Sequence, residues 1–254
     1  MKSIKMMNYD ILKNKCKKLR LDTFSMFIKI GEAHLGGSFS IIEILITLYE
    51  KILLKDDKFV LSKSHASIPL CILLRSYGLK TKITTHLEKD EKNGVFCTTG
   101  SLGHGFPIAT GMALSKKIQK IKGRVFVMIS DGECQEGTTW ESMLIASKHK
   151  LDNLVLLIDY NKIQALSYLK DALPLDNLEN KILSFNWNCL NVKDGHNLKE
   201  IHSKLKKSFK KNKPTAIIFN TIKGKGIKEF ENDPIWHAKK VKNNDIETGN
   251  KALK

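Results

Sequence analysis

Short apolar runs alternate along this sequence with longer stretches of helical, amphipathic character. Four runs have the length and the hydrophobicity of strands buried on both faces of a sheet: 58–61, 125–129, 154–158 and 216–221. Helices are predicted over 10–30, 41–52, 107–117 and 138–150. The alternation predicts an α/β fold in three layers, in which a mostly parallel sheet has helices on both faces.

Two of the predicted helices carry a capping box at their start. Ser40 stands three residues before Glu43, and Thr138 stands three residues before Glu141. In such a box the hydroxyl and the carboxylate each accept a hydrogen bond from a backbone N–H group of the first turn. We therefore expect both helices to begin at these boxes.

The length of 254 residues suits one large α/β domain. We assign residues 1–240 to this domain and expect the polar residues 241–254 to form a loosely ordered tail. No apolar run has the length of a membrane span, and Met1 to Asp10 lack the apolar core of a secretory signal, so we expect a cytoplasmic protein that does not contact membranes. The five cysteines are odd in number and form no close pairs, which predicts free thiols.

The formal net charge is +17, from 43 Lys and Arg against 26 Asp and Glu. Clustered basic residues neutralise phosphates, so this charge raises the hypothesis of nucleic-acid binding. The lysines are spread along the whole chain, however, and the densest stretch, 204–213, is interrupted by Leu205 and Phe209 as on a solvated amphipathic helix. We therefore expect no nucleic-acid partner and a general attraction for anionic sugar phosphates.

An acidic and an amide side chain follow two of the predicted strands. Asp131 comes after the strand 125–129, and Asn161 comes after the strand 154–158. Because the helical crossover between parallel strands brings both strand ends to the same edge of the sheet, we expect these side chains to converge. Their oxygens suit Mg²⁺ or Ca²⁺, and a diphosphate would bridge the ion. Gly132 would let the backbone approach that diphosphate closely and tolerates a positive φ.

Each of these residues also has an ordinary structural explanation. Asp131-Gly132 taken alone is typical of a turn, and Asn161 is typical of a loop. Their pairing across one crossover favours the ion site.

These residues belong to longer motifs that resemble the thiamine-diphosphate enzymes, and among them the amino-terminal, diphosphate-binding half of transketolase. The motifs are Asp-Gly-Glu-Cys-Gln-Glu-Gly at 131–137, Leu-Asp-Asn-Leu at 151–154, and Lys-Gly-Lys-Gly at 223–226 near Trp236-His237. The resemblance covers about residues 10 to 240. It implies the thiamine-diphosphate-binding fold, with thiamine diphosphate and Mg²⁺ or Ca²⁺ as cofactors.

The resemblance also implies an activity, the transfer of a two-carbon ketol unit from a ketose phosphate to an aldose phosphate. Imidazoles that titrate near neutrality are suited to bind such substrates and to move protons. The implied catalytic residues are His34, His86, His237 and Glu136, and the family's counterpart of Glu136 lies at a subunit boundary. The implied cofactor contacts come from His65, Gly100, Ser101, Leu102, Gly132, Glu133, Asn161 and His237. The implied metal ligands are Asp131, Asn161 and the backbone carbonyl of Ile163.

Several positions depart from the family pattern. Ser130 stands where the family has the first glycine of Gly-Asp-Gly, His104 replaces a glutamine and Ala238 replaces a glycine. Leu35 and Leu87 replace prolines. These changes weaken the likeness of the backbone but leave the imidazoles in place. Ser130, His104 and Ala238 favour an alternative function, that of a non-catalytic protein or scaffold that kept the fold.

The resemblance lacks one half of the family's active site. Thiamine enzymes need a glutamate that hydrogen-bonds the aminopyrimidine ring, and transketolases supply it from a second, pyrimidine-binding domain. The resemblance therefore implies that a separate carboxy-terminal subunit is the partner, in a heterotetramer with two copies of each chain.

Two other thiamine enzymes remain as alternatives, a deoxyxylulose-phosphate synthase and a 2-oxo-acid dehydrogenase α subunit. The donor and acceptor sugars also stay open. Both pentose-phosphate metabolism and a specialised sugar pathway are compatible with the sequence.

Overall fold

The computed structural model describes residues 8–165 and 167–254, and these residues form a five-stranded, parallel sheet with the strand order β1-β2-β3-β7-β6. The strands are β1 Lys58–Leu61, β2 Val125–Ser130, β3 Leu154–Tyr160, β7 Thr215–Asn220 and β6 Asn188–Val192. The first four confirm the predicted strands. The edge strand β6 is missing from the prediction, because asparagines interrupt its hydrophobic pattern and most of its side chains are only half-buried. A short antiparallel pair, β4 Ile163–Gln164 and β5 Ser167–Tyr168, follows β3.

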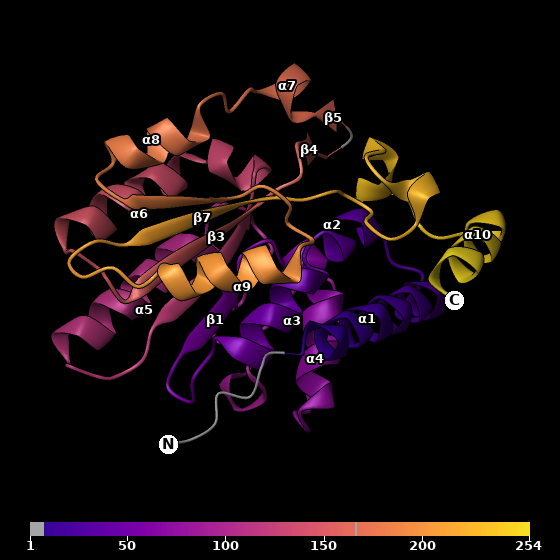
Figure 1. The fold of residues 1–254 in the computed structure, drawn as a ribbon, viewed down its shortest axis with the longest axis horizontal. Coiled ribbons are helices and arrows are strands. Elements are labelled where there is room, and N and C mark those ends of the chain that lie inside the picture. Colours follow the sequence, from indigo (N-terminus) through magenta and orange to yellow (C-terminus); the bar gives the residue numbers. More distant parts are fainter. Residues whose placement is uncertain (1–7, 166) are drawn as a thin grey trace.

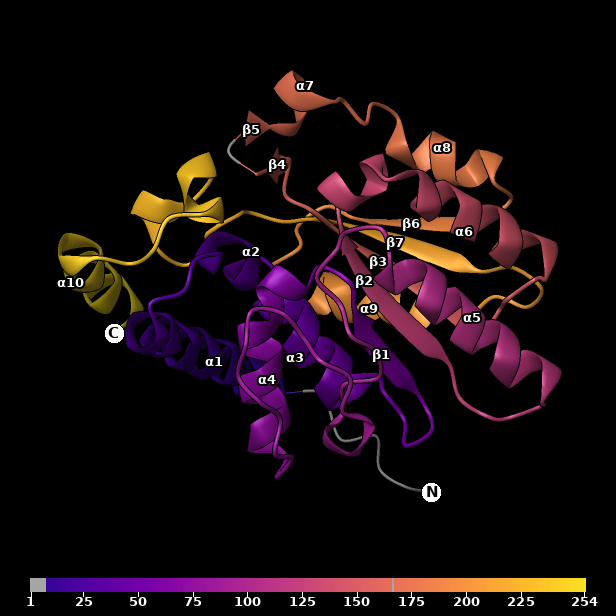
Figure 2. The ribbon, with the colours of Figure 1, turned by 180° about the vertical axis from the view of Figure 1, so that it is seen from behind.

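Helices cover both faces of the sheet, as Figures 1 and 2 show from opposite sides. One layer contains α1 Tyr9–Ile30, α3 Ile42–Lys51, α4 Ser67–Ser76 and α9 Leu198–Lys207. The other layer contains α5 Gly105–Ile118, α6 Gly137–Lys148 and α8 Leu178–Ser184. The shorter helices are α2 Leu35–Phe39, α7 Leu169–Ala172 and α10 Asn243–Leu253. The predicted α/β fold in three layers is confirmed.

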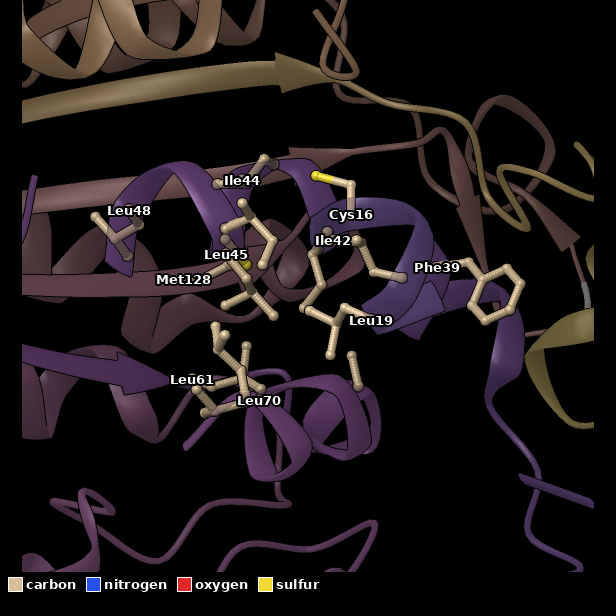
Figure 3. Packing of buried hydrophobic residues seen from close by; sticks show 14 of the residues in the cluster. Cys16, Leu19, Phe39, Ile42, Ile44, Leu45, Leu48, Leu61, Leu70 and Met128 are labelled. Atoms are coloured by element: carbon tan, nitrogen blue, oxygen red, sulfur yellow. The ribbon is translucent and has the colours of Figure 1, made fainter. Parts of the chain in front are cut away.

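The strands supply side chains to two separate cores, because successive residues of a strand point to opposite faces. Met128 of β2 packs in the first core with Leu45 of α3 and Leu70 of α4 (Figure 3). Val127 and Ile129 of the same strand pack in the second core. Full burial of side chains of this size contributes roughly 1.5–3 kcal/mol each, so the strands are firmly held.

The central strands also hold the loops at their carboxyl ends in a fixed register. Ser130 of β2 is paired with Asp159 of β3. Beyond the last pair, the backbone N–H of Asp131 donates to the carbonyl oxygen of Asp159 at 3.1 Å. The residues that follow β2 and β3 therefore start side by side.

The two expected capping boxes are wrong. Helix α6 begins at Gly137, and the Thr138 hydroxyl donates to the Gly103 carbonyl oxygen instead of capping the helix. Helix α3 begins at Ile42 without a side-chain cap, and Ser40 donates to the Gly37 carbonyl and the Asp159 carboxylate. Both hydroxyls therefore bind to residues that are distant in the sequence and not to the helix ends that the pattern predicted.

The expectation of a loosely ordered tail is also wrong for residues 243–253, which form α10. Gly249 packs so closely on the ring of Phe24 in α1 that a Cβ atom there would lie 2.1 Å from Cζ. Leu253, one helical turn further on, is buried as well. The two residues lie four positions apart on one helix face, a spacing that the polar composition hides.

The cysteines agree with the prediction of free thiols. All five cysteines lie in the described part of the chain and are free, and four of them are buried. Within residues 8–165 and 167–254, no helix combines the length and the hydrophobicity needed to cross a membrane.

The contact between α5 and the loop after β1 gives a first prediction. A Cβ atom on Gly105 would lie 2.8 Å from the Cα atom of Ser62, whereas a Cβ atom on Gly111 of the same helix meets open space. We expect Gly105→Ala to lower the free energy of unfolding by about 1–3 kcal/mol through overpacking. Gly111→Ala is the matched control and should raise it by up to about 1 kcal/mol. Urea unfolding of both variants tests this, and equal stability would contradict the packing described here.

Candidate cofactor-binding and active site

A pocket of about 170 Å³ lies where four neighbouring strands end. It is lined by Lys63 after β1, Asp131 after β2, Asn161 after β3 and Lys223 after β7. The carboxyl edge of an open parallel sheet is the usual ligand-binding position of such folds. The sheet therefore brings together side chains that are distant in the sequence, such as Lys63 and Lys223, which are 160 residues apart.

Most of the predicted site residues line this pocket. The residues that do so are Asp131, Asn161, Ile163, Gly132, His65, His237, Leu102 and Glu136. Glu136 is exposed at the start of α6. His34 is not among the lining residues, but its ring centroid lies 5.5 Å from that of His65 and 5.2 Å from that of His237.

Other predicted site residues lie elsewhere. Glu133 is buried, and its Oε1 accepts from the Ser62 hydroxyl and from the Gly103 N–H at 2.9 Å. Burial raises the pKa of Glu133 to about 7. His86 and Ser101 are exposed on loops outside the pocket, and Gly100 packs against the His86 ring. His86, Ser101 and Gly100 are therefore available only to a ligand that extends beyond the pocket, and Glu133 is enclosed by the protein.

Gly132 does not use the positive φ that a glycine tolerates. The backbone there winds into a 3₁₀ turn over Gly132–Gln135, and only a negative φ is needed. The Asp131 Oδ1 accepts from the Gly132 N–H at 2.8 Å and so caps this turn. A Cβ atom on Gly132 would lie 3.2 Å from the Gln164 side chain, so close packing is the constraint on this glycine.

A buried ion pair forms the floor of the site. Asp159, at the end of β3, accepts from the Lys63 ammonium, and both side chains are fully buried. The same carboxylate accepts from Ser40 at 2.7 Å and from the Asn161 Nδ2 at 3.1 Å, and also from Thr221. Burial alone would raise the pKa of Asp159, but the Lys63 charge and these hydrogen bonds hold it below its ordinary value. Segments following β1, β3 and β7 are thus tied to one carboxylate.

Asp131 is a second buried carboxylate, and within residues 8–165 and 167–254 no basic side chain forms an ion pair with it. Its oxygens accept from the backbone N–H groups of Gly132 and Lys162. Burial and the nearby Asp159 charge raise the pKa of Asp131 to about 7. The Asn161 Oδ1 accepts from the Ile163 N–H at 3.1 Å, which fixes the amide. A divalent cation at these oxygens would relieve the unfavourable burial of the Asp131 charge.

Lys223 is a buried cation at the same pocket. Its Nζ lies 3.1 Å from the Ile163 carbonyl oxygen and 3.0 Å from the Nδ1 of His237. Within the described residues it has no carboxylate in ion-pair contact. Burial, together with the Lys63 charge, lowers the pKa of Lys223 to about 8. Such a group favours an anionic ligand.

Three imidazole rings stand beside these charges. The His34, His65 and His237 centroids lie between 5.2 and 5.5 Å from one another. Burial and neighbouring positive charge lower the pKa of each, to about 3 for His237 and well below the ordinary value for His65. His34 has a φ of 73°, a left-handed conformation that is uncommon outside glycine. Three neutral imidazoles are therefore held next to the pocket.

A second network supports the segment before Lys223. The Ile222 N–H donates to the Nε2 of His196 at 2.9 Å, and the His196 Nδ1 lies 2.9 Å from the Glu43 carboxylate. Glu43 in turn accepts from Arg20 at 2.7 Å. These contacts anchor the backbone that carries Lys223.

Sequence reasoning missed Lys63, Asp159 and Lys223 as site residues. Asp159 is the one charged residue of the otherwise apolar strand β3, and Lys63 lies two residues after the end of β1, so their positions were a usable signal. Lys223 belongs to the Lys-Gly-Lys-Gly motif, but nothing in that motif indicates that its side chain is buried.

The family model described as the thiamine diphosphate binding domain of transketolase matches residues 11–254. The chain belongs to the transketolase family. It is 35% identical over 250 residues to the 6-deoxy-6-sulfo-D-fructose transketolase subunit SqwG of Clostridium sp. (strain MSTE9), with 90% of each chain covered. It is 32% identical, over an alignment of 270 residues, to one of the subunits of the apulose-4-phosphate transketolase from Actinobacillus succinogenes, with 98% of each chain covered.

Solved transketolases share the fold. The structure of transketolase from Campylobacter jejuni matches 97% of this chain with a TM-score of 0.87 at 27% identity. The chain spans 43% of that transketolase's length. The predicted resemblance to the amino-terminal, diphosphate-binding half of the family is confirmed.

The Lys63–Asp159 pair at the floor of the site gives a second prediction. Asp159→Asn leaves the Lys63 ammonium buried without its counter-charge, and we expect a loss of about 3–5 kcal/mol in the free energy of unfolding. Adding Lys63→Met should restore more than half of that loss.

The matched control is Asp22→Asn, which breaks the exposed Lys18–Asp22 pair of α1. Asp22→Asn should lower the free energy of unfolding by less than about 1 kcal/mol. Denaturant titrations of the four proteins measure these differences. Equal effects of Asp159→Asn and Asp22→Asn would refute the role given to the buried pair.

Proposed function

We propose that this chain is the amino-terminal, thiamine-diphosphate-binding subunit of a transketolase built from two polypeptides. The complex transfers a two-carbon ketol unit from a ketose phosphate to an aldose phosphate. One observation carries the proposal: Asp131 and Lys223 present opposite buried charges to the same pocket, and neither forms an ion pair within the described residues. A diphosphate with its divalent cation supplies the missing anion and the missing cation together.

The donor set supports Mg²⁺ or Ca²⁺ shared with a phosphate ligand. Among the described residues, no group of three His, Cys, Asp or Glu side chains is placed to hold a metal alone. The proposed ligands are the Asp131 carboxylate, the Asn161 amide oxygen and the Ile163 carbonyl, and phosphate oxygens and water would fill the other positions, as Mg²⁺ prefers. Because the Lys223 ammonium already donates to the Ile163 oxygen, an ion there would share that oxygen or displace the ammonium.

The protein's own groups would handle the protons of the reaction. When bound, thiamine diphosphate supplies the nucleophile and the electron sink for breaking the carbon–carbon bond. His34 and His237 are neutral and stand beside the pocket, so they are suited to hold substrate hydroxyls and to accept or return protons. Such general acid–base catalysis contributes about 10²–10⁴-fold in rate. His86, on a neighbouring loop, would contact the part of the substrate beyond the pocket.

A separate carboxy-terminal subunit is part of the proposal. Relatives of similar length are named as transketolase subunits, and the chain of the Campylobacter jejuni transketolase is more than twice as long. Next to the pocket, Glu136 is exposed at the start of α6, and Leu144 and Ile145 of α6 are 58% and 48% exposed. We propose that the partner covers this surface, in a heterotetramer with two copies of each chain.

The substituted positions, seen in the structure, do not support the alternative of a non-catalytic scaffold. The Ser130 hydroxyl accepts from the Glu133 N–H at 3.2 Å, so this serine supports the turn that follows β2. His104 and Ala238 are exposed and do not obstruct the pocket.

Reconstitution with a candidate partner subunit tests the proposal. We expect ketol transfer from a ketose phosphate when both subunits, thiamine diphosphate and Mg²⁺ are present, and none when either subunit is omitted. Activity with pyruvate as donor would instead favour a deoxyxylulose-phosphate synthase or a 2-oxo-acid dehydrogenase. Cofactor binding without any transfer would favour the scaffold.

Asn161→Ala in the reconstituted complex gives a third prediction. Loss of the amide oxygen should raise the Mg²⁺ concentration needed for half-maximal activity by at least about 10–100-fold, the loss typical when only an outer-shell partner of a metal ligand is removed. Asn244→Ala, on the exposed surface of α10, is the matched control and should leave it unchanged. An unaltered Mg²⁺ requirement in Asn161→Ala would contradict the metal assignment.

A further inference from the structure

His34 and His237 face each other but have different partners at their Nδ1 atoms. The ring centroids are 5.2 Å apart, and the planes are tilted by 77°. The Nδ1 of His34 meets a backbone carbonyl, whereas the Nδ1 of His237 meets an ammonium group. A carbonyl oxygen can only accept a hydrogen bond and an ammonium group can only donate one, so these partners determine where each ring carries its proton.

His34 must donate from Nδ1. Its Nδ1 lies 2.5 Å from the carbonyl oxygen of His237. Burial lowers the pKa of His34, so the ring is neutral near pH 7 and has a single N–H. The proton is therefore on Nδ1, and Nε2 presents a free lone pair. Within the described residues, Nε2 has no hydrogen-bond partner.

His237 must accept at Nδ1. The Lys223 Nζ lies 3.0 Å away. The same Nζ lies 3.1 Å from the Ile163 carbonyl oxygen, and an ammonium group can donate to both neighbours but accept from neither. Lys223 therefore donates to Nδ1. Burial with the Lys223 charge lowers the pKa of His237 to about 3, so the ring is neutral. The single N–H of His237 is then on Nε2.

We propose that Lys223 and the His237 carbonyl lock the two catalytic imidazoles into opposite tautomers, so that His34 presents a proton acceptor at Nε2 and His237 presents a proton donor at Nε2. Lys223 thus acts as a positioning residue, in addition to attracting an anionic ligand. The tautomers are a property of this chain. Their use in catalysis rests on the proposed transketolase function.

The arrangement matches the polar groups of a ketose. Such a sugar has a carbonyl oxygen that accepts hydrogen bonds next to a hydroxyl group that can donate one. The His237 Nε2–H is suited to the carbonyl oxygen, and the His34 Nε2 is suited to the hydroxyl proton. Two imidazoles in the same tautomer would offer two donors or two acceptors and would leave one of these groups unpaired.

Nitrogen NMR of the histidine rings tests the proposal directly. In the ¹⁵N-labelled full chain at pH 6.5, long-range ¹H–¹⁵N spectra distinguish a protonated ring nitrogen from an unprotonated one. We expect protonated Nδ1 in His34 and protonated Nε2 in His237. His196 is an internal reference with protonated Nδ1, because the Ile222 N–H donates to its Nε2. Protonated Nε2 in His34, or protonated Nδ1 in His237, would overturn the proposal.

Lys223→Met tests whether the ammonium fixes the His237 tautomer. We expect the His237 ring to lose its single tautomer and to show averaged nitrogen shifts, whereas His196 stays unchanged. Lys225→Met removes a less buried lysine of the same loop and should leave both rings unchanged. An unaltered His237 in a folded Lys223→Met variant would refute the role of Lys223. If that variant fails to fold, the wild-type spectrum still decides the tautomers.

The NMR spectra test the tautomers, and the activity assay tests the proposed function, so one can be refuted without the other. Opposite tautomers in an inactive reconstituted complex would leave this inference intact and refute the proposed function. The same tautomer in both rings of an active complex would refute this inference and leave the proposed function intact.

Discussion

The buried Lys63–Asp159 ion pair is the interaction on which the geometry of the site depends. Removing two charges from water is unfavourable unless each is fully hydrogen-bonded. The Asp159 carboxylate meets this condition by accepting from Lys63, Ser40, Thr221 and Asn161, which come from four separate segments. Satisfying one buried carboxylate therefore fixes the loops that follow β1, β3 and β7 relative to each other. These loops line the pocket together with the segment that follows β2.

Asp131 and Lys223 carry the charges at the pocket that the proposed ligand would complete. Asp131 and Lys223 are both buried, and burial shifts their pKa values toward neutrality, upward for the carboxyl and downward for the amine. In the part of the chain that the structure describes, neither side chain forms an ion pair. A folded protein retains such uncompensated groups where a ligand completes them. The imidazoles next to them are neutral, so each can donate one hydrogen bond and accept another without adding charge to the site. The same site thus combines fixed charge for binding with neutral bases for chemistry.

Much of this arrangement follows from the sequence, and the rest depends on tertiary contacts. The central strands, Asp131 and Asn161 are predictable because buried strands have a clear hydrophobic pattern and because a crossover brings their ends together. The edge strand β6 and helix α10 are not, since polar side chains obscure their apolar positions. The capping boxes are wrong because Ser40 and Thr138 find distant partners. Lys223 shows the same limit: a lysine in a glycine-rich motif is normally exposed, and only the fold buries it.

Calorimetric titration of thiamine diphosphate into the chain combined with its partner subunit, with Mg²⁺ and then with excess EDTA, tests the central claim most directly. If Asp131 and Lys223 are completed by a metal diphosphate, binding will be tight with Mg²⁺ and at least tenfold weaker without it. Equal affinity in Mg²⁺ and in EDTA, or no binding in either, would contradict the account.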